Sequence, residues 1–246
     1  MLEEVRESPP RFRATPLLVG LGILALVVFV YWPGLSGGFL LDDYPQIVHQ
    51  DAVHMRAVDP ESVRIALEGF RHGTGRPIPM LSFALDHLAW GLDPWGYKLT
   101  SVVVHAINAA LVYALLLRLL ALPSSGSLLR SPWVAAMLAT AWALHPLQAS
   151  TVLYVVQRME SLSMLFVTAG LLAYLAARRR QIKGERAWPW LIAFALFGML
   201  GLACKETAAL LPLYALALEL TMLHFAARNQ LARRAWQWAY ALLLLA

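Results

Sequence analysis

The sequence predicts an all-α protein in which several helices cross a membrane as one polytopic bundle. Two observations lead to this class. The 246 residues are 59% hydrophobic and only 14% charged, whereas soluble domains carry about 25% charged residues. Several apolar stretches also approach or exceed the roughly 20 residues that a helix needs to cross a bilayer. The net charge of +5 is therefore assigned to loops at the membrane surface, and no nucleic-acid partner is expected.

One transmembrane domain covering residues 1–246 accounts for the apolar runs, because no soluble linker or internal repeat interrupts them. The first run lacks a small-residue cleavage site, so we expect an uncleaved span at 15–35. A last run starts at 235 and is too short to cross before Ala246, which predicts a truncated chain. The spans expected between them are 99–120, 128–146, 157–177, 187–205 and 207–225.

The loops between these spans alternate in charge. Clusters of Lys and Arg precede the first span and follow the second, fourth and sixth. Positive loops mark the cytoplasmic side of a membrane protein. We therefore expect the other, non-cytoplasmic side to carry the long segment 36–98, the turn at His145 and the turn at Lys205.

The outer segment 36–98 is too long for an ordinary connection and contains signals for two helices. Asp59-Pro60-Glu61 starts one, because Asp caps helix N-termini and Pro is favoured at the first helical position. A second apolar stretch, from Pro79 to Trp90, is interrupted by Asp86-His87 and is too short to span. Both are predicted to lie along the membrane surface as interfacial helices.

Three small clusters of charge interrupt the apolar sequence where spans meet the outer side. Counting about 20 residues from the cytoplasmic end of each span, at 1.5 Å per residue, places all three near the outer interface. Charges at such positions often mark functional sites in membrane proteins. The clusters are Asp42-Asp43, Arg158-Met159-Glu160 and Lys205-Glu206.

Each cluster has both a functional and an ordinary interpretation. The Asp pair could divide the roles of base and orienting group, or could end a span in a polar loop. Arg158 suits a phosphate because its planar guanidinium offers parallel donors, although interfacial arginines also snorkel to lipid headgroups. Arg158 and Glu160 lie roughly 200° apart around a helix, so each needs a partner from another segment. Lys205 could supply a second positive charge or lie in a hydrated turn.

Other polar residues indicate packing more than chemistry. Ser101, His105 and Asn108 follow one another at i, i+4 and i+7, a stripe for which hydrogen bonding between helices is favoured over catalysis. The histidines show no zinc-type spacing. The chain also lacks a Gly-rich phosphate loop and a Gly-x-Ser-x-Gly elbow, so a soluble nucleotide donor is unsupported. Cys204 is the single cysteine, which excludes an internal disulfide.

Six motifs in order resemble one known family. Between about residues 30 and 220 the chain looks like the membrane half of the transmembrane and tetratricopeptide-repeat O-mannosyltransferases and their bacterial relatives, within the GT-C glycosyltransferases. The resemblance implies a GT-C-like fold and C-terminal tetratricopeptide repeats in the full-length protein. The motifs are Gly37-Gly38-Phe39-Leu40-Leu41-Asp42-Asp43, Arg76-Pro77, Leu92-Asp93-Pro94-Trp95-Gly96-Tyr97, His145-Pro146, Gln157-Arg158-Met159-Glu160 and Lys205-Glu206.

The resemblance also implies roles for these residues. The family's proposed base is an acidic residue of the first outer loop, which here matches Asp42 and Asp43, with Asp42 favoured. Arg158 matches the arginine that would bind the lipid phosphate, and Lys205 belongs to the matching Lys-Glu turn. One departure is Ser101, which stands where relatives often have Asn. Supporting roles fall to Arg76, His145, Gln157, Glu160 and Glu206.

The residues and the resemblance together predict a membrane glycosyltransferase. It would move mannose or another hexose, with inversion, from a polyprenyl-phosphate donor to a Ser or Thr hydroxyl of a protein acceptor. The site is expected on the non-cytoplasmic face of a bacterial cytoplasmic membrane, or of the endoplasmic reticulum in a eukaryote. No cofactor is required and no metal ligand is assigned, although paired carboxylates could hold a divalent cation. The alternative is a non-catalytic lipid-phosphate carrier or membrane scaffold, for which polar or broken helices would be expected near the bilayer midplane.

Overall fold

The chain forms helices joined by turns, and the computed structural model describes residues 14–68, 76–122 and 130–245. Every regular element within these ranges is helical, which confirms the predicted all-α class. Two features noted in the sequence lie outside the described residues, namely the basic residues before the first span and the loop after the second span. The sequence Gly73-Thr74-Gly75-Arg76-Pro77 also predicts a turn between the two helices expected in segment 36–98, and its first three residues lie outside the described ranges.

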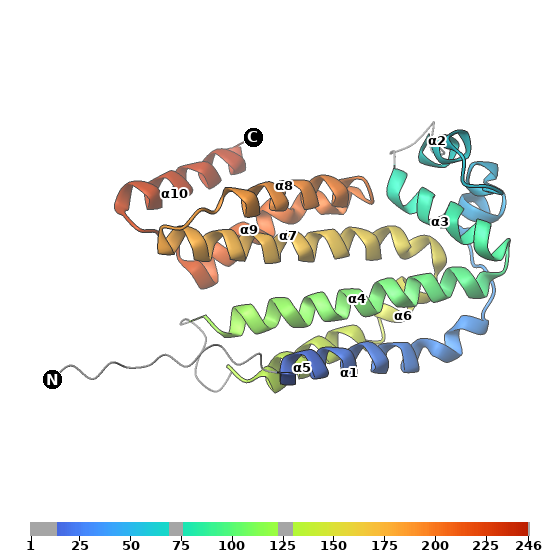
Figure 1. Ribbon diagram of the computed structural model, residues 1–246, viewed down its shortest axis with the longest axis horizontal. Helices are drawn as coiled ribbons and strands as arrows, with labels where there is room; N and C mark the ends of the chain where they lie inside the picture. The colour runs from blue at the N-terminus through green and yellow to red at the C-terminus, as the bar shows by residue number, and fades with distance from the viewer. Residues whose placement is uncertain (1–13, 69–75, 123–129, 246) are drawn as a thin grey trace.

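The long helix α4 (Pro94–Leu120) lies at the centre of the bundle (Figure 1). It packs against α1 (Ala14–Tyr31), α5 (Pro132–Ala143) and α7 (Arg158–Lys183). Small residues let membrane helices approach one another closely. The contact of α4 with α1 and α5 is accordingly rich in buried alanines, namely Ala106, Ala109, Ala135 and Ala139.

A second layer continues from α7. Helix α8 (Trp188–Leu202) runs back along α7, and α9 (Leu211–Leu218) returns beside them (Figure 1). Gly201 is required where α8 meets the turn before α9, because a Cβ there would lie 2.8 Å from the Cβ of Ala208. Helix α10 (Gln230–Leu245) completes the described chain.

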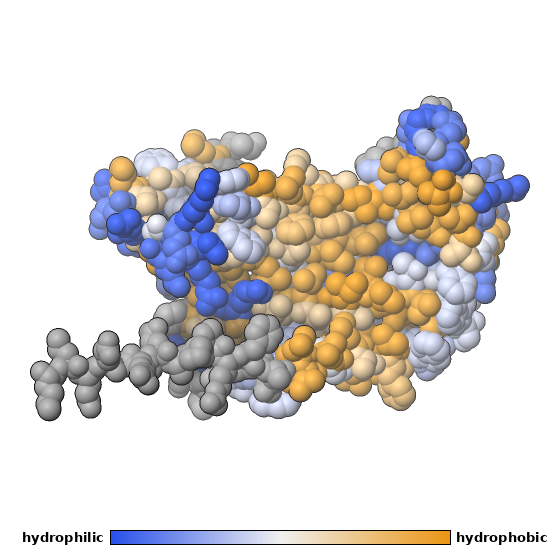
Figure 2. Space-filling view, viewed as in Figure 1, coloured by the Kyte–Doolittle hydropathy of each residue, from blue (hydrophilic) through white to orange (hydrophobic). Residues whose placement is uncertain are grey.

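The long helices have the dimensions and composition of membrane spans. Within the described ranges, four stretches are long and apolar enough to cross, and the shorter apolar helices α5 and α8 lie among them. Figure 2 shows an apolar band over the middle of the helices, with hydrophilic residues gathered toward both ends. The chain is a multi-pass membrane protein, as predicted. The four stretches are Pro16–Ser36, Pro94–Leu120, Val155–Lys183 and Glu206–Leu223.

Several helices differ in length from the predicted spans. Helix α4 starts before 99 because the carboxylate of Asp93 accepts the N–H of Trp95 at 3.0 Å and caps it. Helix α5 is shorter than 128–146, since the chain turns at His145-Pro146. Helix α7 continues to Lys183, and α10 begins at Gln230 rather than 235. A search for apolar runs misses the end turns of a helix when those turns contain capping or charged residues.

The end of the bundle that carries segment 36–98, called the outer end after the sequence prediction, is built from short elements. Segment 36–98 contains α2 (Pro60–Glu68) and α3 (Pro77–Trp90), at the positions of its two helix signals. Asp59 caps α2 as the sequence indicates, because one carboxylate oxygen accepts the N–H groups of Glu61 and Ser62, each at 3.0 Å. A further helix, α6 (Gln148–Leu153), was not predicted and leads into α7 through a 3₁₀ turn.

Candidate active site at the outer end of the bundle

Asp43 ties the first outer loop to the start of α7. Its side chain is fully buried, and its two oxygens accept the backbone N–H groups of Leu40 at 2.9 Å and Val156 at 2.7 Å. Burial raises the pKa of Asp43, while these N–H groups and the positive charge of Lys98 act in the opposite direction. The contacts occupy both oxygens, so Asp43 acts as an anchor for the loop.

The environment of Asp42 is the opposite of the buried environment of Asp43. It is exposed, and its backbone N–H donates to the hydroxyl of Tyr154 at 2.8 Å. The pKa of Tyr154 is raised by desolvation and, to a smaller extent, by the carboxylate of Asp42 beside it. Asp42 is therefore held beside Tyr154, and its side chain is exposed to solution, as a general base requires. The neighbouring residue Leu41 sits at φ 37°, in the left-handed region.

The position of Arg158 differs from the one predicted. Its side chain is fully buried and forms an ion pair with Asp86 of α3 at 2.5 Å. The guanidinium also donates to the hydroxyl oxygens of Ser82 at 2.8 Å and Ser101 at 3.1 Å, and to the carbonyl of Tyr97. These contacts leave no open face for a lipid phosphate. Arg158 instead joins α3, α4 and α7 below the loop that carries the aspartates.

Two other cations meet beside the first turn of α7. Lys205 Nζ lies 2.8 Å from Glu160 Oε2, and an Arg76 Nη atom lies 2.9 Å from Glu206 Oε2. Arg76 also donates to the sulfur of Met159 at 3.2 Å. Each cation is partly exposed, with 24% and 21% of the Lys205 and Arg76 side chains accessible. The sequence indicated that Glu160 needs a partner from another segment, and Lys205 is that partner.

The remaining predicted residues have local contacts. His145 is exposed after α5, and its Nδ1 accepts the N–H of Leu147 at 3.3 Å. Gln157 is half-buried and immediately precedes α7. Both lie at the outer end of the bundle without a long-range contact that would give them a defined chemical role.

The polar stripe of α4 forms hydrogen bonds between helices, which confirms its predicted role. His105 Nε2 lies 2.9 Å from the carbonyl oxygen of Ala143, and Asn108 donates to the carbonyl of Ser161 at 2.7 Å. Ser101 accepts from Arg158. These bonds attach α4 to α5 and α7, and so fix the depth at which the outer residues stand.

Three residues that shape this end of the molecule had no role predicted from the sequence. Asp86 stood out only as an interruption of an apolar stretch, yet it neutralises Arg158. Tyr154 holds the loop at Asp42. Lys98 faces Asp43 from the first turns of α4. A charge search could flag Asp86 and Lys98, but their partners depend on how distant segments pack.

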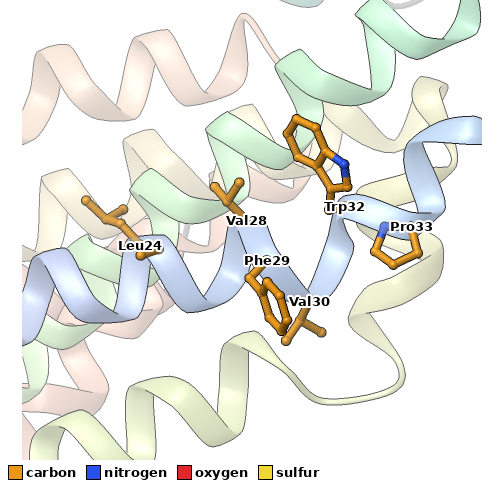
Figure 3. Close-up of a pocket in the computed structure, with 7 residues that line it drawn as sticks. Leu24, Val28, Phe29, Val30, Trp32 and Pro33 are labelled. Carbon is orange, nitrogen blue, oxygen red and sulfur yellow. The ribbon is translucent and has the colours of Figure 1, made fainter.

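An apolar surface depression lies away from these residues. It has a volume of about 800 Å³ on α1 and the turn after it, where Leu24, Val28 and Phe29 are among the lining residues (Figure 3). Its lining carries no acid, base or hydroxyl group. A surface of this composition on a membrane span faces lipid hydrocarbon. Among the residues that the structure describes, no group of three His, Cys, Asp or Glu side chains could hold a metal ion.

Comparison with known proteins gives a consistent set of relatives, although no family model and no solved structure matches. Protein O-mannosyl-transferase Tmtc1 of Drosophila melanogaster is 33% identical over 78% of this chain and 21% of its own length. The Tmtc2 protein of the same species is 33% identical over 75% of this chain and 20% of its own length. Human TMTC2 is 28% identical over 74% of this chain. The chain thus spans about one fifth of these relatives, and its similarity places it in the family of the transmembrane and tetratricopeptide-repeat protein O-mannosyl-transferases.

Proposed function

We propose that this chain is the membrane part of a GT-C-type glycosyltransferase that moves mannose or another hexose from a polyprenyl phosphate to a Ser or Thr hydroxyl of a protein. The relatives are named as protein O-mannosyl-transferases, which supports a sugar transfer to protein. One structural observation carries the proposal. The exposed carboxylate of Asp42 stands at the end of the bundle where Arg76 and Lys205 converge on the first turn of α7.

The reaction is a single displacement. Asp42 accepts the proton of the acceptor hydroxyl, and the hydroxyl oxygen forms a bond to the anomeric carbon. The bond between that carbon and the phosphate oxygen breaks, and its electron pair leaves with the lipid phosphate. Attack from the face opposite the leaving group inverts the anomeric centre. Arg76 and Lys205 stabilise the charge that develops on the departing phosphate.

In this proposal Lys205 keeps its expected role at the phosphate and Arg76 replaces Arg158 there. Both cations now pair with carboxylates, Glu206 and Glu160, that a phosphate could displace. Arg158 becomes a positioning residue, because it is buried against Asp86. The proposal assigns no role to a divalent cation, because Arg76 and Lys205 supply the positive charge for the departing phosphate. Chelation by EDTA is expected to leave transfer unchanged.

The site faces the non-cytoplasmic side of a bacterial cytoplasmic membrane, or the lumen of the endoplasmic reticulum in a eukaryote. The positive residues at the opposite end of the helices, including Arg179, Arg180 and Lys183, support this orientation. The protein acceptor is recognised with the help of tetratricopeptide repeats in the full-length protein. A cysteine-accessibility experiment on Asp51→Cys, with membrane-impermeant reagent added to sealed vesicles or intact cells, tests the orientation.

The activity is tested by transfer of hexose from polyprenyl-phosphate hexose to an acceptor protein, with the full-length protein in membranes. Asp42→Asn is expected to reduce transfer at least 100-fold, the scale of a general base. Asp51→Asn is the matched control, because its exposed carboxylate lies in the same outer segment. Transfer by Asp42→Asn at the wild-type rate would show that another residue is the base. Failure of the wild-type protein to transfer sugar from this donor would exclude the proposed reaction.

A further inference from the structure

A polar cavity of about 190 Å³ lies among α4, α5, α6 and α7. Its lining combines side chains from all four helices. Six of the eight lining residues have polar side chains, and burying such groups is costly inside a bundle that is otherwise apolar. They are His105, Asn108, Gln148, Thr151, Glu160 and Ser161.

Two of these polar groups are buried and have no partner. The Asn108 and Ser161 side chains are 1% and 3% exposed, and both Asn108 Oδ1 and Ser161 Oγ lack a hydrogen bond. The amide nitrogen of Asn108 donates to the backbone carbonyl of Ser161 at 2.7 Å, which fixes the amide and leaves its oxygen as a free acceptor. A buried polar group without a partner costs about 1–3 kcal/mol. Such a pair in a cavity lining indicates a ligand that brings hydroxyl groups.

The cavity adjoins the residues proposed for the reaction. Glu160 contributes to its lining and lies 2.8 Å from Lys205 Nζ, the proposed phosphate contact. Val156, which holds Asp43, lies in the 3₁₀ turn that leads into α7, and Glu160 is in the first turn of that helix. A phosphate bound at Lys205 would therefore carry its sugar substituent at the mouth of this cavity.

We propose that the cavity is the binding site for the hexosyl group of the donor, an inference that rests on the proposed function. The volume is far more than the roughly 30 Å³ of one water and less than the roughly 300 Å³ at which sites for drug-sized ligands begin. It therefore suits one sugar ring and excludes the polyprenyl chain. Sugar hydroxyls satisfy Asn108 and Ser161, while the ring of Trp142, 5.4 Å from the ring of His105, offers an apolar wall.

The test compares two ligands on the full-length protein in nanodiscs: polyprenyl-phosphate mannose and polyprenyl phosphate without sugar. Ser161→Ala removes only a hydroxyl that has no partner, so the fold should be retained. We expect it to weaken binding of the sugar-bearing lipid about 3- to 10-fold, the loss of one hydrogen bond, and to leave binding of the bare lipid phosphate unchanged. Ser161→Leu, which fills the cavity, should weaken it further.

The matched control is Thr168→Val. Thr168 is on the same helix and is also buried with an unpartnered hydroxyl, but it does not line the cavity. Its binding of both lipids should equal that of the wild type. Thermal unfolding verifies that each variant is folded.

The outcomes separate this inference from the proposed reaction. A wild-type preference for the sugar-bearing lipid that Ser161→Ala removes supports the hexosyl site, even if no transfer to protein is detected. Three results would overturn it: equal weakening of both lipids, no wild-type preference for the sugar, or the same loss in Thr168→Val. In those cases the cavity holds water only, and the transfer assay decides separately on the proposed function.

Discussion

The carboxylate of Asp43 accepts a hydrogen bond of 2.7 Å from the backbone N–H of Val156, which lies 113 residues later in the chain. This bond connects the loop after α1 to the turn that begins α7. The exposed neighbour Asp42 is joined to the same region through Tyr154. The position of Asp42, the candidate base, therefore depends on α6 and α7 as well as on α1.

Substitution of the anchoring residue should reduce both stability and activity. Asp43→Asn keeps one acceptor oxygen and places an amide NH₂ against one of the two backbone N–H donors. Leaving that buried donor unpaired is expected to cost about 1–3 kcal/mol of unfolding free energy. Thermal unfolding in detergent measures the loss, and the transfer assay measures the displaced loop. Asp42→Asn should lose transfer but keep the wild-type unfolding temperature; equal destabilisation by the two changes would contradict their separate roles.

The buried ion pair of Arg158 and Asp86 should show strong coupling. Arg158→Met leaves the Asp86 carboxylate buried without its partner, and breaking such a pair costs roughly 3–5 kcal/mol. The double variant Arg158→Met with Asp86→Leu should recover most of that loss, because two apolar groups replace two charges. A double-mutant cycle measured by chemical unfolding gives the coupling energy. Additive losses would mean that the two residues do not depend on each other.

The contributions of Asp43 and Asp59 to stability should change with pH in opposite directions. Burial raises the pKa of Asp43, so its contribution to stability is largest below about pH 4 and declines as pH rises through the raised pKa. Hydrogen bonds from Ser62 lower the pKa of Asp59, so its contribution is present above about pH 4 and is lost as pH falls through the lowered value.

The measurement is the unfolding temperature across a pH series. The difference between wild type and Asp43→Asn should shrink as pH rises, and the difference between wild type and Asp59→Asn should shrink as pH falls. The two differences in unfolding temperature act as controls for each other, because a general effect of acid on the bilayer mimetic would change both in the same direction.

Binding of a lipid phosphate should depend on Lys205 and Arg76. Removing one charged hydrogen bond costs about 1.5–3 kcal/mol, so Lys205→Ala is expected to weaken binding of polyprenyl phosphate about 10-fold or more. Lys183→Ala removes an exposed charge at the opposite end of α7 and should have no effect. Raised ionic strength should weaken the wild type more than Lys205→Ala. If Arg158→Lys, rather than Lys205→Ala, abolishes binding while the protein stays folded, the phosphate contact lies at Arg158.

Much of the fold could be predicted from the sequence, because a helix that crosses lipid needs a continuous run of apolar residues. Apolar runs reveal α1, α4 and α7, and the Asp59-Pro60 signal reveals α2, since both depend on neighbouring residues alone. Helix α6 was missed for the same reason. Its six residues are too short to show a period, and they are helical because of where the preceding turn and the start of α7 hold them.

Only part of the candidate site could be predicted from the sequence. Sidedness and helix length predicted that the charged clusters share one end, and Glu160 with Lys205 shows this directly. Arg158 could not be placed correctly, because its depth in the bundle depends on Asp86 of a separate helix. Their pairing depends on tertiary packing, and residue spacing within α3 or within α7 cannot predict it.

The ion pair between Arg158 and Asp86 also has a consequence for how the chain is inserted. Asp86 precedes α4 and α7 in synthesis, so in the proposed orientation it would cross to the far side of the membrane before the span that carries Arg158 inserts. An arginine is costly in a membrane until a partner satisfies it. In that orientation Asp86 supplies the counter-charge of Arg158 before α7 inserts, so we expect the bundle to assemble from the N-terminus toward α7.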